Sequence, residues 1–254
     1  MDPTQRFSTR VEKYVKYRPG YPEALIGLLQ GEFGLGPSSV VADIGSGTGI
    51  LTQLFLENGS RVYGIEPNRL MREAGERLLE GYAGFTSIAA TAESTSLEDR
   101  SVDFVTSGQA FHWFDQIRSR AEFVRILRPR GWVVLVWNDR RTSSTPFLAA
   151  YERLLREYGT DYDTVNHKLI GPDVFDRFFA GGSKRCTTFE NRQLLDLAGL
   201  EGRLLSSSYA LEPGHPRYEE MLDELQQIFR AYQANGKICF DYDTIVYFGR
   251  FSPA

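Results

Sequence analysis

The sequence predicts an α/β fold, with a doubly wound, mostly parallel sheet of seven strands, an antiparallel last strand and helical insertions. Short β-branched runs at 102–105 and 132–136 suit strands that are buried on both faces of a parallel sheet. Segments with helical spacing lie between such runs, for example at 117–127. Alternating strands and helices imply right-handed crossovers, and ligands then bind beyond the carboxyl ends of the strands.

The first βα connection is the most informative segment. Residues 40–44 form a short apolar run, and the chain then passes Gly45, Gly47 and Gly49 into a helix predicted over about 48–58, which Gly59 ends. Glycines permit positive φ and let a ligand approach main-chain N–H groups that a Cβ would block. The helix also directs its positive end into this turn. The turn therefore predicts a cofactor site.

The glycine spacing indicates the kind of cofactor. A dinucleotide fingerprint needs G-x-G-x-x-G, and here Ile50 takes the place of the last glycine. A second predicted strand, 61–65, ends at Glu66, where a carboxylate can accept hydrogen bonds from both ribose hydroxyls. These features favour a nucleoside ligand. An NAD-dependent oxidoreductase is disfavoured by Ile50 and by the lack of a plausible catalytic Tyr-x-x-x-Lys.

Together these motifs resemble the class I S-adenosylmethionine-dependent methyltransferases. In that family the glycine turn holds the methionine part of the cofactor, the acid after the second strand holds the ribose, and residues after the third and fourth strands complete the site. The resemblance implies S-adenosylmethionine as cofactor and S-adenosylhomocysteine as product. The cofactor-binding residues that it implies are Asp43, Gly45, Ser46, Gly47, Glu66, Pro67, Met71, Ala92, Glu93 and Gln109.

Two further segments narrow the resemblance. Residues 17–22 (Tyr-Arg-Pro-Gly-Tyr-Pro) and 109–115 are similar to the subgroup that contains the trans-aconitate methyltransferases. The resemblance covers most of residues 5–138 and leaves the acceptor open. The segment before the fifth strand departs from the usual Leu-Lys-Pro-Gly-Gly in having Arg130 at the first glycine place.

The chain is predicted to be one domain over 1–254. It divides into an N-terminal lid segment (1–22), a cofactor-binding core (23–138), helical substrate-side insertions (139–183 and 191–235) and closing strands (184–190 and 237–250). Helices are predicted at 192–205 and 216–233. The last strand shifts its alternation after Tyr242, which predicts a bulge near Asp243. The insertions and the N-terminal segment are expected to roof the crevice.

Composition limits the partners. The net charge is −4, and without a long Lys/Arg run the chain lacks the basic face that nucleic acids favour. No leader pattern or bilayer-length apolar run is present, so we expect no membrane partner and a cytoplasmic location. Cys186 and Cys239 are expected to be reduced thiols in strands. His167 and His215 form no metal-ligand spacing, so no metal is predicted. The oligomeric state stays open.

The acceptor side has three candidate residues. His112, after the fourth strand, is the candidate catalytic residue, either positioning the acceptor or acting as a base, and the alternative is a packed wall residue. Trp113 is a candidate wall against the sulfonium or the acceptor, with core packing as the alternative. Arg140, in the pair Arg140-Arg141, is a candidate to meet an acidic substrate unless the pair is simply solvated. Asp115 is predicted to cap the helix that begins at Gln116.

The N-terminal segment supplies two more candidates. Pro19 and Pro22 prevent the polar and aromatic stretch 5–22 from running as one helix, so it is predicted to close over the cofactor as a lid. Arg18 is a candidate partner of the methionine carboxylate, and Tyr14 a candidate cofactor contact. Anchoring of the segment to the domain surface is the alternative for both.

The sequence thus predicts methyl transfer to a small-molecule acceptor, with a carboxylate or hydroxyl oxygen ahead of nitrogen or carbon. The Asn/Asp-Pro-Pro-Tyr/Phe run typical of methyltransferases acting on DNA bases or amides is absent after the fourth strand, where Ser107-Gly108-Gln109-Ala110 stands. The main alternative is a protein that binds the cofactor without turnover.

Overall fold

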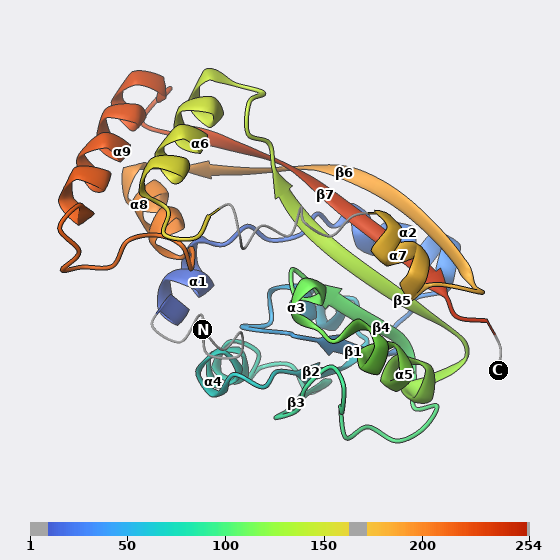
Figure 1. Ribbon diagram of the computed structural model, residues 1–254. Helices are drawn as coiled ribbons and strands as arrows, with labels where there is room; N and C mark the ends of the chain where they lie inside the picture. The colour runs from blue at the N-terminus through green and yellow to red at the C-terminus, as the bar shows by residue number, and fades with distance from the viewer. Residues whose placement is uncertain (1–9, 163–171, 253–254) are drawn as a thin grey trace.

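The computed structural model describes residues 10–162 and 172–252. Its strands form a single seven-stranded sheet in the order β3-β2-β1-β4-β5-β7-β6 (Figure 1). Strands β1 to β5 pair in parallel, whereas β7 runs antiparallel to both β5 and β6. The predicted fold class is therefore confirmed, including the antiparallel last strand. The strands are β1 (Val40–Ile44), β2 (Arg61–Ile65), β3 (Phe85–Ile88), β4 (Val102–Gly108), β5 (Leu127–Arg140), β6 (Ser183–Leu195) and β7 (Ile238–Arg250).

Helices cover both faces of this sheet and extend past one end of it. They are α1 (Val11–Tyr17), α2 (Ala24–Phe33), α3 (Ile50–Glu57), α4 (Arg69–Leu78), the short 3-10 turn η3 (Phe111–Trp113), α5 (Gln116–Ile126), α6 (Pro146–Tyr158), α7 (Pro172–Phe178), α8 (Leu197–Leu205) and α9 (Tyr218–Tyr232).

Alternate residues of the central strands pack into two separate cores. Val41 of β1 contributes to a core with α2 and α3, whereas Ala42 contributes to a core with α5 and α7. This period-two division is what a sheet buried on both faces requires. It leaves the carboxyl ends of β1, β2 and β4 at one edge, where the predicted site residues follow.

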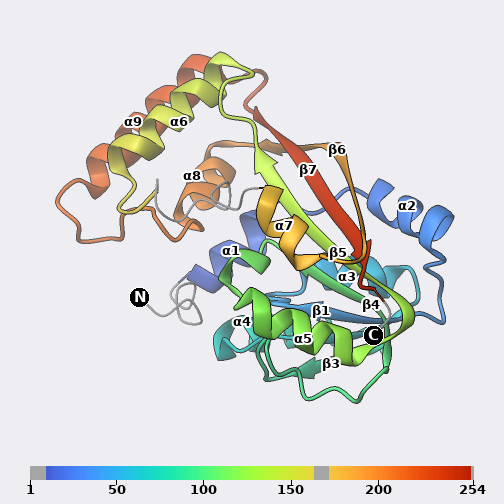
Figure 2. The same cartoon turned by 45° about the vertical axis from the view of Figure 1, so that its right-hand side comes forward.

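A third core lies at the far ends of the long strands β5, β6 and β7. Helices α6, α8 and α9 gather there, beside the sheet (Figures 1 and 2). Tyr151 of α6 packs edge-on against Phe240 of β7, with ring centroids 5.0 Å apart. The helical insertions thus have their own apolar core, which holds α8 in place over the crevice.

The predicted bulge near Asp243 is wrong. β7 pairs without interruption, from Tyr242 opposite Arg140 to Ile245 opposite Trp137. The alternation of the sequence misleads because the fully buried position is Thr244, whose hydroxyl donates to Asn138 Oδ1 at 2.6 Å. A buried polar residue with a hydrogen-bond partner breaks the hydrophobic pattern without breaking the strand.

The helix predicted at 192–205 starts too early. Residues 192–195 belong to β6, and α8 begins at Leu197 after Asp196, whose carboxylate accepts from Gly199 N at 2.7 Å. Arg192–Leu195 pair instead with Asp241–Ile238 of β7. The cap residue, rather than the helical spacing, marks the boundary.

Other local expectations are confirmed. Asp115 caps α5 by accepting from the main-chain N–H groups of Ile117 and Arg118. Cys186 and Cys239 are free thiols in β6 and β7. Arg130, at the departure from the usual glycine, has φ +71°, so the backbone keeps a conformation that glycine adopts at less cost.

Within the described residues, no helix combines the length and apolar character that crossing a bilayer requires.

Candidate active site

The turn between β1 and α3 takes a left-handed conformation at all three of its glycines. Gly45, Gly47 and Gly49 have φ values of +67°, +57° and +87°. A Cβ on Gly45 would lie 2.5 Å from the Cβ of Ala110, and one on Gly49 would lie 2.6 Å from Leu79 Cδ1. Close packing excludes side chains at these two positions. At Gly47 the nearest atom is Met71 Cε, at 3.3 Å, on the side where a ligand would approach.

Glu66 connects this turn to the end of β2. Its Oε2 accepts from Gly47 N at 2.9 Å, and its Oε1 accepts from Asn68 N at 2.8 Å. Burial raises the pKa of Glu66, while these two hydrogen bonds and Arg72 act in the opposite direction. Each carboxylate oxygen keeps a lone pair, so Glu66 retains the capacity to accept from two further donors.

A first cavity of about 160 Å³ lies beside Glu66. Its walls are formed by side chains that follow the ends of β2, β3 and β4. Two of these, Met71 and Ala92, are almost completely buried in the protein. Glu93 Oε1 accepts from Asp115 N at 2.9 Å, which ties the segment after β3 to the start of α5. The structure brings together here the predicted residues Glu66, Pro67, Met71, Ala92, Glu93 and Gln109.

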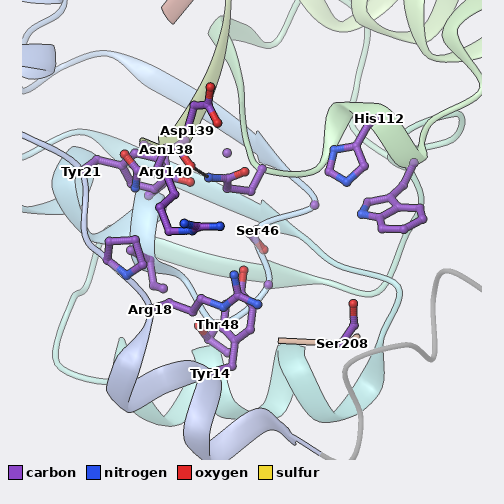
Figure 3. A pocket seen from close by; sticks show the side chains of 18 of the residues that line it. Tyr14, Arg18, Tyr21, Ser46, Thr48, His112, Asn138, Asp139, Arg140 and Ser208 are labelled. Carbon is purple, nitrogen blue, oxygen red and sulfur yellow. Dashed lines mark hydrogen bonds between the residues drawn. The ribbon is translucent and has the colours of Figure 1, made fainter. Parts of the chain in front are cut away.

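A second cavity of about 180 Å³ lies on the other side of the glycine turn. The two cavities share Tyr14, Gly45, Gly47, Gln109 and Trp113 in their walls, together with Gly108. In Figure 3, Arg18 and Arg140 reach into this space from one side and His112 faces it from the other. One continuous crevice therefore runs past the turn, and it holds the other predicted residues Arg18, Asp43, Ser46, His112 and Arg140.

Asp43 forms part of the floor of this crevice. Its carboxyl group accepts from the hydroxyls of Thr52 and Thr106, at 2.6 and 3.0 Å. Burial raises the pKa of Asp43 to about 7, and the threonine hydrogen bonds limit the rise. Asp43 therefore ties β1 to β4 and α3, and its contact with the cofactor stays a prediction.

The predicted arginine pair separates at the end of β5. Arg140 has a side chain only 10% exposed, which contacts Glu152 at 2.5 Å and donates to the Tyr162 hydroxyl at 3.0 Å. Arg141 points away and pairs with Asp243 at 2.7 Å near the surface. Of this pair, Arg140 lines the second cavity, and its contact with a substrate stays a prediction.

The N-terminal segment makes more contacts than its sequence indicates. Arg18 Nη2 donates to Ser206 O at 3.0 Å, and its guanidinium lies 4.9 Å from the Tyr14 ring centroid. Arg10 donates to the carbonyls of Ser207 and Ala210 after α8. Anchoring and cofactor contact are thus compatible for Arg18 and Tyr14, since both residues also line the crevice.

We expect the same segment to become more rigid when cofactor binds. Amide hydrogen exchange across residues 5–20 should slow on adding S-adenosylhomocysteine, because Tyr14 and Arg18 gain contacts that hold α1 against the crevice. Residues 5–9 of this range lie outside the described residues. Peptides from α9, which is absent from both cavity walls, serve as the internal control. Equal exchange with and without ligand would contradict the lid.

Several wall residues of the second cavity are not among the site residues that the sequence predicts. Tyr21 lies where a Cβ on Gly108 would meet its hydroxyl at 2.5 Å, so the glycine at the end of β4 makes room for it. Asn138 donates to Gly20 O at 3.0 Å and so ties β5 to the N-terminal segment. Five others come from insertions that no motif marks: Thr142, Tyr162, Arg203, Ser208 and Tyr209.

No cluster of His, Cys, Asp and Glu suited to a metal ion occurs in the parts of the chain that the structure describes. His215 lies on the surface, where its Nδ1 accepts from Arg217 N at 3.2 Å. His167 is outside the described residues.

The crevice fits the parts of S-adenosylmethionine. The buried carboxylate of Glu66, with lone pairs to spare, suits a ribose diol. The apolar side chains of Met71 and Ala92 suit the adenine face, and Gly45 and Gly47, which line both cavities without a Cβ, leave room for the methionine part. Arg18, on the second cavity, suits the methionine carboxylate.

Comparisons with known proteins agree with this fit. A family profile described as a methyltransferase domain matches residues 42–135. An uncharacterised methyltransferase of Mycobacterium tuberculosis is 30% identical over 236 residues, which cover 92% of this chain and 89% of that protein. An uncharacterised methyltransferase-like protein of Schizosaccharomyces pombe is 26% identical over 253 residues, which cover 98% and 96%.

A solved structure shows the same fold. A protein of Anaeromyxobacter dehalogenans, described as a candidate type II methyltransferase, has a TM-score of 0.68 at 23% identity, over 94% of this chain and all of that one. With the M. tuberculosis relative aligned over nearly the full length of both proteins, the chain belongs to the class I S-adenosylmethionine-dependent methyltransferases, and S-adenosylmethionine is its cofactor.

Proposed function

We propose that the protein methylates a small-molecule acceptor at an oxygen atom, either of a carboxylate or of a hydroxyl group. The second cavity is the observation that carries this proposal. It continues past the glycine turn, so it offers room for an acceptor beside the methionine part of the cofactor. Its walls come from α1, β5, η3 and α8, which surround the space on several sides and suit a compact ligand.

Two features support a small molecule over a polymer. The net charge of −4 disfavours a phosphate-rich chain, and the end of β4 carries Gly108 and Gln109 in place of the run typical of base and amide methyltransferases. We also infer a cytoplasmic location, in keeping with the free thiols Cys186 and Cys239.

Methyl transfer requires mainly that cofactor and acceptor be held in line. When bound, S-adenosylmethionine supplies a methyl group that its sulfonium already activates. The protein contributes by holding the reactants in line, worth up to about 7–11 kcal/mol, and by excluding water. Gln109 Nε2 donates to Asn138 O at 3.0 Å and so braces the end of β4, while Tyr14 and Trp113 line both cavities. These groups define the path between cofactor and acceptor.

His112 is proposed to position the acceptor. Its ring lies on the second cavity, 4.6 Å from the ring of Trp113. If it only positions a carboxylate, His112→Gln should keep turnover within about tenfold of the wild type, because an amide still donates a hydrogen bond and no proton is removed. The measurement is turnover with cofactor affinity determined in parallel, and exposed His215→Gln is the matched control.

If His112 acts as a general base, the same experiment should give a different result. Turnover of His112→Gln would fall about 10²- to 10⁴-fold, and the wild-type rate would drop on the acid side between about pH 5.5 and 7.5, as the imidazole takes up a proton. That pair of results would show that positioning is the wrong role for His112.

The experiment that tests the proposed function is a methyl-transfer screen. It would cover small carboxylic acids, phenols, amines and sterol-like compounds, with release of S-adenosylhomocysteine as the signal. We expect turnover among the carboxylic acids or the hydroxyl compounds. Turnover of the amines alone would overturn the choice of oxygen. Cofactor binding without turnover of any panel member would favour a protein that binds the cofactor without catalysis.

A further inference from the structure

We propose that the acceptor carries an anionic group, a carboxylate or a phosphate, which Arg203 and Arg140 bind in the second cavity. This inference rests on the proposed function, since it names the substrate class for the same site. Three arginines, Arg18, Arg140 and Arg203, line this one cavity and come from three distant parts of the chain.

Arg203 is a buried cation that the described residues do not neutralise. It is 7% exposed, and its Nε and Nη1 donate to the hydroxyls of Tyr242 and Ser207, at 3.2 and 3.1 Å. These partners are neutral, and no ion pair joins Arg203 to a carboxylate of residues 10–162 or 172–252. A buried charge without an opposite charge is costly, and an anion in the adjoining cavity would compensate it.

Arg140 lines the same cavity, and its Nη1 group is available to donate a hydrogen bond. Its Nη2 is engaged by Glu152 and Tyr162, whereas its Nη1 is buried and has no hydrogen-bond partner in the described part of the chain. The planar guanidinium lies 5.1 Å from the Tyr151 ring centroid, which helps to fix its orientation. A fixed guanidinium with a free N–H suits the oxygen of a carboxylate or phosphate.

The cofactor alone does not account for the charge of Arg203. Arg18 and Arg203 line the same cavity, and burial together with the positive charge of Arg203 lowers the pKa of Arg18. The methionine carboxylate is one anion and is assigned to Arg18. Arg203 then lacks an opposite charge in the complex unless the acceptor brings one.

Neither carboxyl group of the described cavity wall, Asp43 or Asp139, forms an ion pair with Arg203. Asp43 is held by Thr52 and Thr106 on the floor, and burial favours its protonated form by raising its pKa to about 7. Asp139 also lines the cavity, but within the described residues Arg203 forms its hydrogen bonds with hydroxyl groups and no ion pair with either aspartate. A cationic acceptor would add a like charge beside Arg203, so an anionic acceptor is the better match.

The test measures anion binding to protein saturated with S-adenosylhomocysteine, which occupies the methionine carboxylate site. The probes are succinate, inorganic phosphate and, as an uncharged counterpart, succinamide, each followed by titration calorimetry. We expect at least one anion to bind and succinamide not to bind. The succinate and phosphate arms decide between a carboxylate and a phosphate as the preferred group.

Variants then locate the site. Arg203→Gln should weaken binding of the preferred anion by about 10- to 100-fold, the usual effect of losing a charged hydrogen-bond partner. Arg140→Gln should weaken it in the same direction and carries the test if Arg203→Gln does not fold. Arg217→Gln is the matched control, because Arg217 pairs with Glu157 and Glu220 on the surface, away from both cavities.

The outcomes of these experiments distinguish a failure of the anionic acceptor from a failure of the proposed methyl transfer. Binding of S-adenosylhomocysteine together with failure of both anions to bind would overturn the anionic acceptor only. Equal binding of succinate and succinamide, or anion binding that neither Arg203→Gln nor Arg140→Gln weakens, would do the same. Failure to bind S-adenosylhomocysteine would instead count against the proposed methyl transfer.

Discussion

Gly47→Val is expected to abolish binding of S-adenosylhomocysteine. Gly47 has φ +57°, a conformation that a β-branched residue adopts only with strain. A Cβ there would stand 3.3 Å from Met71 Cε, and valine would add two γ-methyl groups at a residue that lines both cavities. Strain in the turn would also disturb the hydrogen bond from Gly47 N to Glu66. Titration calorimetry measures the loss, with circular dichroism to establish that the variant is folded.

The chain offers a matched control for backbone strain. Gly34, at the end of α2, has φ +73°, and a Cβ added to it would meet no atom within 4 Å. Gly34→Val therefore carries a similar backbone penalty, about 1–2 kcal/mol, at a site remote from the cavities. It should lower the melting temperature but bind ligand normally. A folded Gly47→Val variant with wild-type affinity would show that the glycine turn is only structural.

The cofactor side of the crevice could be predicted because its signals are local. Gly45, Gly47 and Glu66 each follow the carboxyl end of a strand, and parallel strands bring those ends to one edge of the sheet. The strand runs are strongly apolar and alternate with helices, which predicts a parallel sheet, although the spatial order places β1 between β2 and β4 and β7 between β5 and β6. The structure adds the hydrogen bond that joins Glu66 to Gly47, which no sequence spacing specifies.

The acceptor side could not be predicted in the same way. Arg203 and Tyr209 reach the cavity because α8 packs against α1, a contact between segments almost two hundred residues apart. The sequence marks no such pairing, since Arg203 lies in the largely apolar run Leu197–Leu205, and nothing in that run indicates which segment it packs against. Contacts of this kind follow from tertiary packing, so an arginine near a site is indistinguishable in sequence from a solvated one.

Glu66→Ala is expected to weaken binding of S-adenosylhomocysteine by about 1.5–3 kcal/mol, the range for hydrogen bonds to a charged group. Two effects contribute, because the change removes the proposed ribose acceptor and also leaves the N–H groups of Gly47 and Asn68 without their partner. Calorimetry measures the loss. Glu73→Ala is the matched control, since Glu73 lies on α4 nearby and, among the described residues, forms its ion pair with exposed Arg69.

A ligand pair separates the two effects. If Glu66 accepts from the ribose, the wild type should bind adenosine more tightly than 2′-deoxyadenosine, and Glu66→Ala should bind the two nearly equally. This comparison is a double-mutant cycle in which the second change is made in the ligand. A general distortion of the turn weakens binding of both ligands equally, so it cancels in the ratio of their affinities. If the variant still prefers adenosine by the wild-type ratio, the hydroxyl is recognised by another group, and the effect of Glu66 on affinity arises from its support of the Gly47 turn.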